Sequence, residues 1–355
     1  MASSDLPQTL EQFYPLVLAL AVQNLKVNTF TDNFDADRFN IDGNDHAMDF
    51  DTNARVFYFD WYFRNWVNLF NAYQLLEDDQ SRLLYLHLIA YRMAGHLSIR
   101  LPVEFANKKA EFENYLSIEK STVSKLAISG MFGKLRHFDF EYGGNKYVID
   151  CLGLEAYLFR RQYFYEQDGV RIAPESGDFV VDGGACLGDT AAVFSNAVGA
   201  NGRVYSFDPV AAHQEILQYN TKQFPHQNVV IVPAGLSDHE VVCPPIILSG
   251  YAPGFSVQNQ QVPLRSLDYM VKAGEIERVD FIKLDIEGAE LEALRGAKET
   301  IHQFKPKLAV SLYHKPNDLF ELVTFIQTKF PFYRFRLGHY TIHQEETVLY
   351  CISEA

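Results

Sequence analysis

The sequence predicts an α/β fold: a doubly wound, mostly parallel seven-stranded sheet preceded by a mainly helical N-terminal domain. From Gly177 onward, short apolar runs alternate with amphipathic segments, a pattern typical of parallel strands connected by helices. Residues 1 to about 150 lack this alternation and are rich in aromatic side chains. One apolar run also leads through an acidic residue and a glycine-rich turn into a helix, as in nucleotide-binding βα units. We therefore expect two domains, residues 1–150 and 151–355.

Seven apolar runs of strand length occur in the second half of the chain. They cover residues 179–182, 204–208, 229–232, 281–285, 308–312, 333–337 and 347–352. Helices are expected to begin near Gly188, Ala211, Glu290 and Pro316. Ligands of such sheets bind outside the carboxyl ends of the strands, at the topological switch point.

The first 150 residues favour helices. Apolar residues recur at helical spacing between Leu75 and Leu97, and residues 78–81 include side chains suited to cap a helix. The apolar stretch Leu16–Val22 predicts a buried helix rather than a signal peptide, because acidic residues precede it. Residues 143–145, Gly-Gly-Asn, predict a hairpin turn. Aromatic residues between 61 and 73 are expected in a helical core, with a sugar-binding platform as the less favoured alternative.

Composition and charge disfavour several classes of protein. A net charge of -14 argues against nucleic-acid binding through a broadly basic surface, which needs many contacts from Lys and Arg to phosphates. The sequence contains no run of about 18 apolar residues, so we expect no membrane span. The four cysteines are widely spaced and form no CxxC pair, which indicates reduced thiols in a cytoplasmic protein. We expect a small-molecule or glycan acceptor as partner, and a homo-oligomer is compatible with the sequence.

The strongest motif spans residues 182–190, Asp-Gly-Gly-Ala-Cys-Leu-Gly-Asp-Thr. Its glycines allow close backbone approach to a ligand, and the helix that follows offers free N–H groups to a carboxylate or phosphate. Ala185 replaces the middle glycine of the dinucleotide fingerprint. A carboxylate directly before the glycines suits the α-ammonium of a methionine moiety. The candidate cofactor-binding residues here are Asp182, Gly183, Gly184, Ala185, Gly188, Asp189 and Thr190.

Two further strand ends supply cofactor candidates. Asp208, followed by Pro209, ends the second strand twenty residues after Gly188 and is placed to accept hydrogen bonds from both ribose hydroxyls. The third strand ends near Ser237 and Asp238, either of which could contact an adenine, although a plain surface turn is an equal alternative. Together these positions predict S-adenosyl-L-methionine as the cofactor.

Charged residues alternate at the end of the fourth predicted strand. Lys283, Asp285 and Glu287 would point to one side of a strand, and three charges there are costly unless they are paired or lie at its open end. The alternative is an internal ion pair from Lys283 to Glu287, with Glu290 capping the next helix. His314 follows the adjacent strand, so it and Asp285 are candidates for general-base catalysis. We expect these four residues, Lys283, Asp285, Glu287 and His314, to form the catalytic site.

Three other interpretations stay open. Asp285, Glu287 and His314 could hold a divalent metal ion, which is not favoured because no dedicated ligand spacing is present. An NAD-dependent sugar oxidoreductase is disfavoured by Ala185 and by the missing Tyr-x-x-x-Lys pair. A catalytically inactive nucleotide-sensing or scaffold protein is disfavoured by the acidic residues at the fourth strand end.

In these stretches the chain resembles the FkbM family of S-adenosylmethionine-dependent methyltransferases. The matching stretches are residues 182–190, 263–268, 282–290 and 346–350. The resemblance implies a class I, Rossmann-like methyltransferase that methylates a hydroxyl of a sugar, glycan or glycosylated natural product, for example in polysaccharide biosynthesis. The family more often carries Glu where Asp208 stands, and we expect the shorter carboxylate still to reach the ribose.

Overall fold

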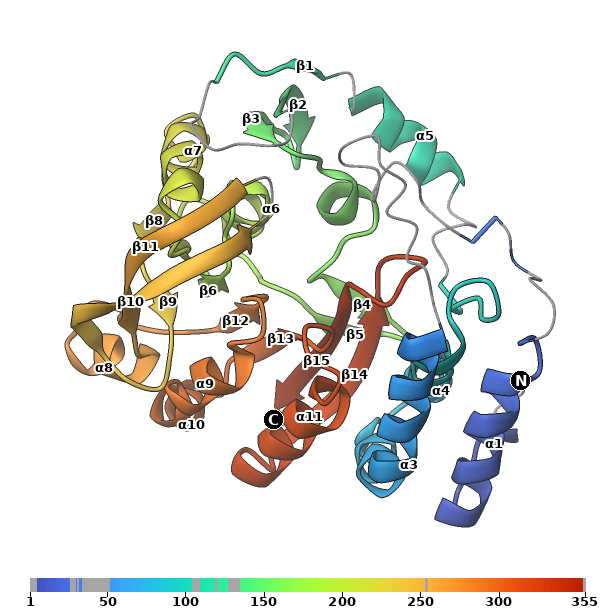
Figure 1. The fold of residues 1–355 in the computed structure, drawn as a ribbon. Helices are drawn as coiled ribbons and strands as arrows, with labels where there is room; N and C mark the ends of the chain where they lie inside the picture. The colour runs from blue at the N-terminus through green and yellow to red at the C-terminus, as the bar shows by residue number, and fades with distance from the viewer. Residues whose placement is uncertain are drawn as a thin grey trace. The chain divides into compact units, whose positions relative to one another are not determined.

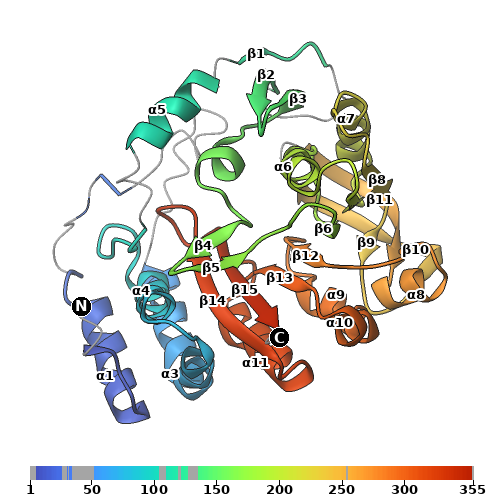
Figure 2. The same ribbon diagram turned by 180° about the vertical axis from the view of Figure 1, so that it is seen from behind.

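The structure is a computed structural model that describes residues 5–25, 30, 32–33, 52–103, 109–118, 121–126, 135–252 and 255–353. The chain divides into two compact units, residues 1–106 with 311–350 and residues 107–310 with 351–353. Figures 1 and 2 show the ribbon from two opposite sides. Compactness alone does not delimit a domain, and the domain boundary expected near residue 150 stays a prediction.

Seven strands form the main sheet, in the order β14-β15-β13-β12-β6-β7-β8. They are β6 (Phe179–Gly183), β7 (Arg203–Phe207), β8 (Val229–Val232), β12 (Phe281–Leu284), β13 (Lys307–Ser311), β14 (Tyr333–His339) and β15 (Thr347–Ser353). The five strands from β13 to β8 pair in parallel. All seven predicted strands are present, with ends shifted by two residues or fewer, and the predicted fold class is confirmed.

The chain reverses direction across the sheet between β6 and β12. From β6 it runs outward through β7 to β8, and it later returns to place β12 on the other side of β6. The carboxyl ends of the parallel strands lie in register, with Phe207 opposite Gly183, Gly183 opposite Leu284, and Leu284 opposite Val310, the residue before the last in β13. This arrangement places the topological switch point at the carboxyl ends of β6 and β12.

Helices connect these strands as the alternating pattern predicts. They are α6 (Asp189–Val198), α7 (Ala211–Thr221), α8 (Leu267–Lys272), α9 (Glu290–Arg295) and α10 (Lys298–Phe304). The helix expected near Gly188 begins one residue later, because Gly188 has a φ of 95° and breaks the chain direction between turn and helix. The starts expected at Ala211 and Glu290 are confirmed.

A long hairpin between the third and fourth parallel strands was not predicted. It consists of β10 (Val241–Ala252) and β11 (Phe255–Arg265), and β11 also pairs with the short strand β9 (Gly235–Leu236). The register shifts between Val241 and Ile246, a span that contains two prolines. Proline lacks an N–H donor and normally marks strand edges or bulges, so it concealed the strand pattern.

The remaining elements of this unit precede β6. They are α5 (Lys109–Ile118), β1 (Thr122–Val123), β2 (Arg136–Tyr142), β3 (Asn145–Cys151), the π-helix η3 (Glu155–Phe159), β4 (Tyr165–Gln167) and β5 (Val170–Ile172). The predicted hairpin turn is confirmed, since Tyr142 pairs with Asn145 and both glycines between them have positive φ. The side chain of Asn220 on α7 bonds the backbone of Asp150 through both its oxygen and its nitrogen, which fixes β3 against that helix.

The other unit joins the N-terminal helices to residues 311–350. It contains α1 (Leu10–Val22), α3 (Thr52–Leu75), α4 (Asp79–Ala94), α11 (Asp318–Lys329) and β14, and in both views α3 and α4 lie beside α11 and β14 (Figures 1 and 2). Asp78 caps α4 through Ser81 N, as expected from the capping residues near the start of this run. Trp61, Tyr62 and Tyr73 are buried, as the core assignment predicts, whereas Trp66 is half-buried and Phe63 is exposed. None of the described helices is long and apolar enough to cross a membrane.

Candidate functional site

The glycine-rich turn after β6 is tied to the two neighbouring strands. The N–H groups of Gly184 and Ala185 both donate to the carbonyl of Phe207, at 2.9 and 3.0 Å. Gly184 has a φ of 80°, and a Cβ at this position would lie 1.9 Å from the carbonyl oxygen of Asp285. This glycine is therefore required by packing within the protein, in addition to the close approach of a ligand that the sequence predicts.

Asp182 and Lys283 form an ion pair beneath this turn. Their charged groups lie 3.3 Å apart, and the Lys283 ammonium also donates to the carbonyls of Gly183 at 2.9 Å and Gly184 at 2.7 Å. Thr190 Oγ1 donates to the same carboxylate at 2.8 Å. Burial alone would lower the pKa of Lys283, but the carboxylates of Asp182 and Asp285 raise it above its ordinary value, so the lysine stays protonated.

The Lys283 ammonium holds the glycine-rich turn from inside the protein and does not point outward. Asp182, with no exposed surface, likewise points into the protein. The contact of Asp182 with the α-ammonium of a methionine moiety stays a prediction, and so does the catalytic role of Lys283. Asp189, the first residue of α6, is also buried, and burial raises its carboxyl pKa to about 6.

Asp208 is held by two backbone donors and a histidine. Its carboxylate accepts hydrogen bonds from Cys186 N at 2.9 Å and Val210 N at 2.8 Å, and His213 Nδ1 lies 3.1 Å from Oδ2. Only 4% of the residue is exposed. His213 was not predicted from the sequence; it lies in the first turn of α7, where its ring can reach back to the strand end. The ribose contact of Asp208 stays a prediction.

A side chain of the unpredicted hairpin secures the same corner. Gln260 on β11 donates through Nε2 to the carbonyl of Pro209 at 2.5 Å and accepts from Ala211 N at 3.0 Å. The amide thereby spans the loop between β7 and α7. No sequence signal pointed to Gln260, because the strand that carries it was hidden.

The third strand end differs from its expected geometry. Leu236 packs toward the turn, where its Cδ1 would lie 3.0 Å from a Cβ on Gly183. Ser237 is bonded through its N–H to the carbonyl of Arg265, and its own carbonyl lies against Gly296. Asp238 is exposed and bonds His239. At this strand end it is thus β9 that packs against the glycine-rich turn. The contact of Ser237 or Asp238 with an adenine stays a prediction.

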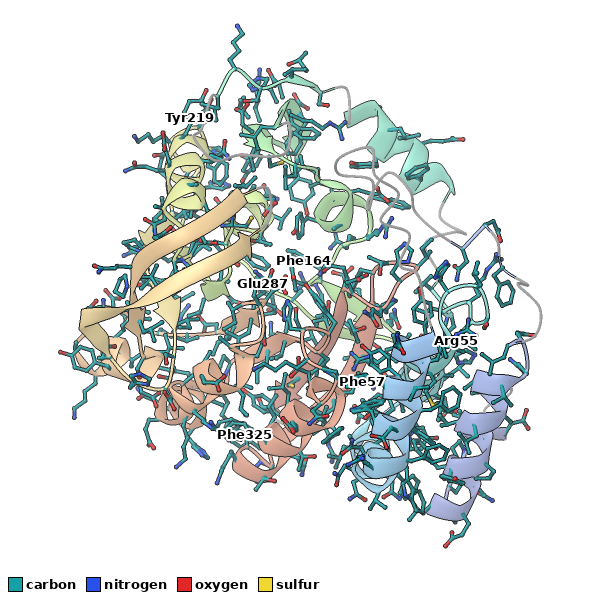
Figure 3. The ribbon with its side chains drawn as sticks, in the orientation of Figure 1. Arg55, Phe57, Phe164, Tyr219, Glu287 and Phe325 are labelled. Carbon is teal, nitrogen blue, oxygen red and sulfur yellow. The ribbon has the colours of Figure 1, made fainter. Side chains whose placement is uncertain are left out.

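The expected alternation of charges along β12 ends at Leu284. Asp285 continues for one step, with its N–H donating to Gly183 O at 3.2 Å, but Glu287 has a φ of 57° and belongs to a turn. Lys283 is buried, Asp285 is half-buried and Glu287, labelled in Figure 3, is exposed. Because Glu287 lies in the turn after β12, the three residues do not share one strand face. Glu290 accepts from the N–H groups of Ile286 and Gly288 in the preceding turn, and the N-cap residue of α9, Ala289, makes no side-chain cap hydrogen bond. The ion-pair partner recorded for Lys283 is Asp182.

Asp285 has a partner that the sequence did not reveal. The hydroxyl of Tyr163 donates to Asp285 Oδ2 at 2.7 Å, although 122 residues separate the two along the chain. Such a contact between distant segments leaves no local pattern, so it could be found only once the fold was known.

His314 lies in the segment after β13, within the unit that contains the N-terminal helices. Its ring contacts that of Tyr313, with centroids 4.2 Å apart. The buried Arg92 donates to the carbonyls of Leu312 at 3.2 Å and Pro316 at 2.8 Å, which lie on either side of His314. The pairing of His314 with Asp285 stays a prediction. Among the residues that the structure describes, no group of three or more His, Cys, Asp or Glu side chains is arranged to hold a metal ion.

Comparisons with known proteins agree with this geometry. Residues 182–337 match the model of the methyltransferase FkbM domain. Among solved structures, the methyltransferase FkbM from Methylobacillus flagellatus KT aligns with a TM-score of 0.54 and 21% identity, over 82% of this chain and 59% of that one. The chain thus spans about three fifths of that relative's length. No curated protein matches the chain.

Two further solved structures are similar at a lower level. Fibrillarin from Aeropyrum pernix, in complex with natively bound S-adenosyl-L-methionine, aligns with a TM-score of 0.35 and 12% identity, over 65% of this chain and all of that one. A SAM-dependent methyltransferase from Aquifex aeolicus aligns with a TM-score of 0.33 and 16% identity, over 51% of this chain and 84% of that one. Similarity at this level supports no inference about binding.

The strand order and the turn after β6 define a class I methyltransferase fold. Residues 182–337 match the methyltransferase FkbM domain, which confirms the resemblance read from the sequence.

Proposed function

We propose that the protein is an S-adenosylmethionine-dependent methyltransferase that methylates a hydroxyl group of a sugar, glycan or glycosylated natural product. One observation carries this proposal. The glycine-rich turn, Asp208 and Asp285 follow strand ends that lie in register at the switch point, and backbone hydrogen bonds connect them. Ligands of doubly wound sheets bind at this edge.

The charges around the turn favour a cationic ligand. The carboxylates of Asp189 and Asp208 lie at or beside it, whereas the charges of Asp182 and Lys283 compensate each other in a buried pair. A surplus of carboxylates attracts a sulfonium with its ammonium group and repels a pyrophosphate. The charge balance therefore supports S-adenosylmethionine over NAD.

Several segments would hold this cofactor. The turn from Gly183 to Gly188 would lie against the methionine moiety, Asp208 would meet the ribose, and Gly235 and Leu236 of β9 would border the base. When bound, the cofactor supplies a methyl group activated by its sulfonium. The protein has to align the acceptor oxygen with that methyl and remove the hydroxyl proton.

Asp285 is the side chain best placed for the proton. It follows β12 directly, is half-buried, and lies beside the turn through its bond to Gly183. As a carboxylate it would accept a hydrogen bond from the acceptor hydroxyl and take up its proton as the oxygen reacts. His314 is a second candidate for the same task.

A transfer assay with methyl-labelled S-adenosylmethionine tests the proposal. The protein would be incubated with cell-wall sugars, nucleotide sugars and glycolipids, and calorimetry would compare its affinity for S-adenosylmethionine and NAD. We expect binding of the former alone and label transfer to a hydroxyl. Preferential NAD binding, or tight S-adenosylmethionine binding with no transfer to any acceptor, would contradict the proposal.

A further inference from the structure

The segment between the π-helix η3 and β4 carries strained backbone that neither the sequence motifs nor the family match covers. Arg161 has a φ of 54° and Tyr163 a φ of 72°, both in the left-handed region that side chains other than glycine rarely adopt. Strain of this kind persists only where the surroundings fix it, and it concentrates at functional sites. π-Helices likewise concentrate there.

Aromatic packing holds this segment in place. The ring of Tyr163 lies 6.3 Å from that of Phe194 on α6, and the ring of Phe164, labelled in Figure 3, lies 5.8 Å from the same residue. Phe194 in turn contacts Phe281 at the start of β12. Tyr163 is fully buried as a result, and its hydroxyl has a fixed position relative to β12.

Two polar contacts give that hydroxyl a direction. Gln162 Nε2 donates to it at 3.1 Å, so the hydroxyl proton is directed to its other neighbour, Asp285 Oδ2, at 2.7 Å. The face of the Tyr163 ring lies 5.3 Å from the ammonium of Lys283, a cation–π contact with the residue that supports the glycine-rich turn. One side chain therefore contacts both the support of the turn and the candidate catalytic carboxylate.

We propose that Tyr163 is a positioning residue for Asp285: its hydroxyl fixes the orientation of the carboxylate and keeps it ionised. This inference rests on the proposed function only in the role it gives to Asp285. A hydroxyl that donates to a carboxylate stabilises the charged form, so it lowers the pKa of the acid. A buried tyrosine whose hydroxyl merely fills space would leave the pKa of Asp285 unaffected.

Other charged groups stay constant in the comparison. The ammonium of Lys283 interacts with the carboxylate of Asp285 and also with those of Asp182 and Asp189. Glu287 lies two residues further along the chain. Replacing Tyr163 by Phe changes none of these groups and keeps the ring over Lys283.

The test is the pKa of Asp285 in the whole protein, measured by carbon-13 NMR of protein labelled at its aspartate carboxyl carbons. The Asp285 signal is the one that Asp285→Asn removes. In Tyr163→Phe we expect its pKa to rise by about one pH unit, the usual effect of one hydrogen bond to a charged group. Gln162→Met should cause a smaller rise, and it decides the question if Tyr163→Phe does not fold.

Tyr147→Phe is the matched control, because it removes the hydroxyl of another fully buried tyrosine, on β3. It should leave the pKa of Asp285 unchanged. No rise in either Tyr163→Phe or Gln162→Met, or an equal rise in Tyr147→Phe, would overturn the proposal. With an acceptor in hand, the acid side of the kcat/KM profile should move to higher pH in Tyr163→Phe. A pKa rise in a protein that transfers no methyl group would instead contradict the proposed function and leave the contact intact.

Discussion

Lys283 and Asp182 form an ion pair with Nζ and Oδ1 3.3 Å apart, and 1% or less of either residue is exposed. The ammonium also bonds two consecutive carbonyls of the glycine-rich turn. Because the pair is fully buried, its two charges depend on each other, and the shape of the turn depends on both. Removing one partner leaves an uncompensated charge where water cannot reach it.

Lys283→Met should therefore lower the free energy of unfolding by about 3 to 5 kcal/mol, the usual effect of breaking a buried pair. The double variant Asp182→Asn with Lys283→Met should lose much less than the sum of the single losses, since it leaves no unpaired charge. Urea unfolding of the four proteins measures this coupling. Additive losses would show that the two residues stabilise the fold independently.

The buried carboxyl of Asp189 should make stability depend on pH. Burial raises its pKa from 3.8 to about 6 in the folded protein, so the folded state binds a proton more tightly than the unfolded state. The stability it contributes is present at low pH and is lost as the pH rises from about 4 to about 6. At about 1.4 kcal/mol per pH unit, the loss amounts to about 3 kcal/mol.

Asp189→Asn removes this titration and keeps an oxygen that can accept from Thr190 N. Without cofactor, the variant should be more stable than the wild type at about pH 8 and equal to it at about pH 3. Urea unfolding at the two pH values measures the difference. A variant whose stability matches that of the wild type at both pH values would contradict the raised pKa.

Gly184 and Gly144 allow the cost of a contact to be separated from the cost of backbone strain. Both have φ near 80°, but a Cβ on Gly184 would lie 1.9 Å from Asp285 O, whereas none of the described atoms lies within 4 Å of one on Gly144. We expect Gly144→Ala to cost about 1 kcal/mol of stability and Gly184→Ala several times more. Thermal unfolding measures both. Equal losses would show that the turn can move away from β12.

Local sequence patterns predicted the strands and a helix cap, whereas contacts between distant segments could not be predicted from the sequence. Strand positions followed from apolar runs, and the cap of α4 from Asp78, because both are local patterns. The alignment of Lys283 with Glu287 was wrong, since β12 ends before Glu287 and the turn that follows redirects its side chain. Tyr163 and Gln260 contact the site from segments that are distant in sequence, and such contacts depend on the fold.

Asp208 connects cofactor recognition to the turn itself. It accepts from Cys186 N within the turn and from Val210 N before α7, so its removal alters the site as well as any ribose contact. Asp208→Ala should weaken S-adenosylmethionine binding by at least about tenfold. Asp208→Asn, which keeps an acceptor oxygen but no charge, should lose less. Calorimetry measures both, and unchanged affinity in the alanine variant would refute the assignment.

Asp285→Asn should separate chemistry from cofactor binding. The residue lies at the end of β12, beside the turn but outside it, and it is half-buried, so an acceptor can reach it. We expect kcat to fall by roughly 10²- to 10⁴-fold, the usual contribution of a positioned acid-base group, with affinity for S-adenosylmethionine within a few-fold of wild type. His314→Ala should behave in the same way if it shares the proton transfer.

Asp168→Asn is the control for this substitution, because Asp168 is exposed at the turn between β4 and β5 and its φ of 50° is one that asparagine tolerates. Its turnover should match wild type.

The assay of the wild-type protein is repeated in EDTA. Loss of activity that Mg²⁺ or Mn²⁺ restores would indicate that Asp285 acts through a metal ion, and unchanged activity would indicate direct base catalysis. If Asp285→Asn and His314→Ala both turn over normally, the acceptor is deprotonated by another group, and Asp285 serves only to anchor Tyr163 against β12.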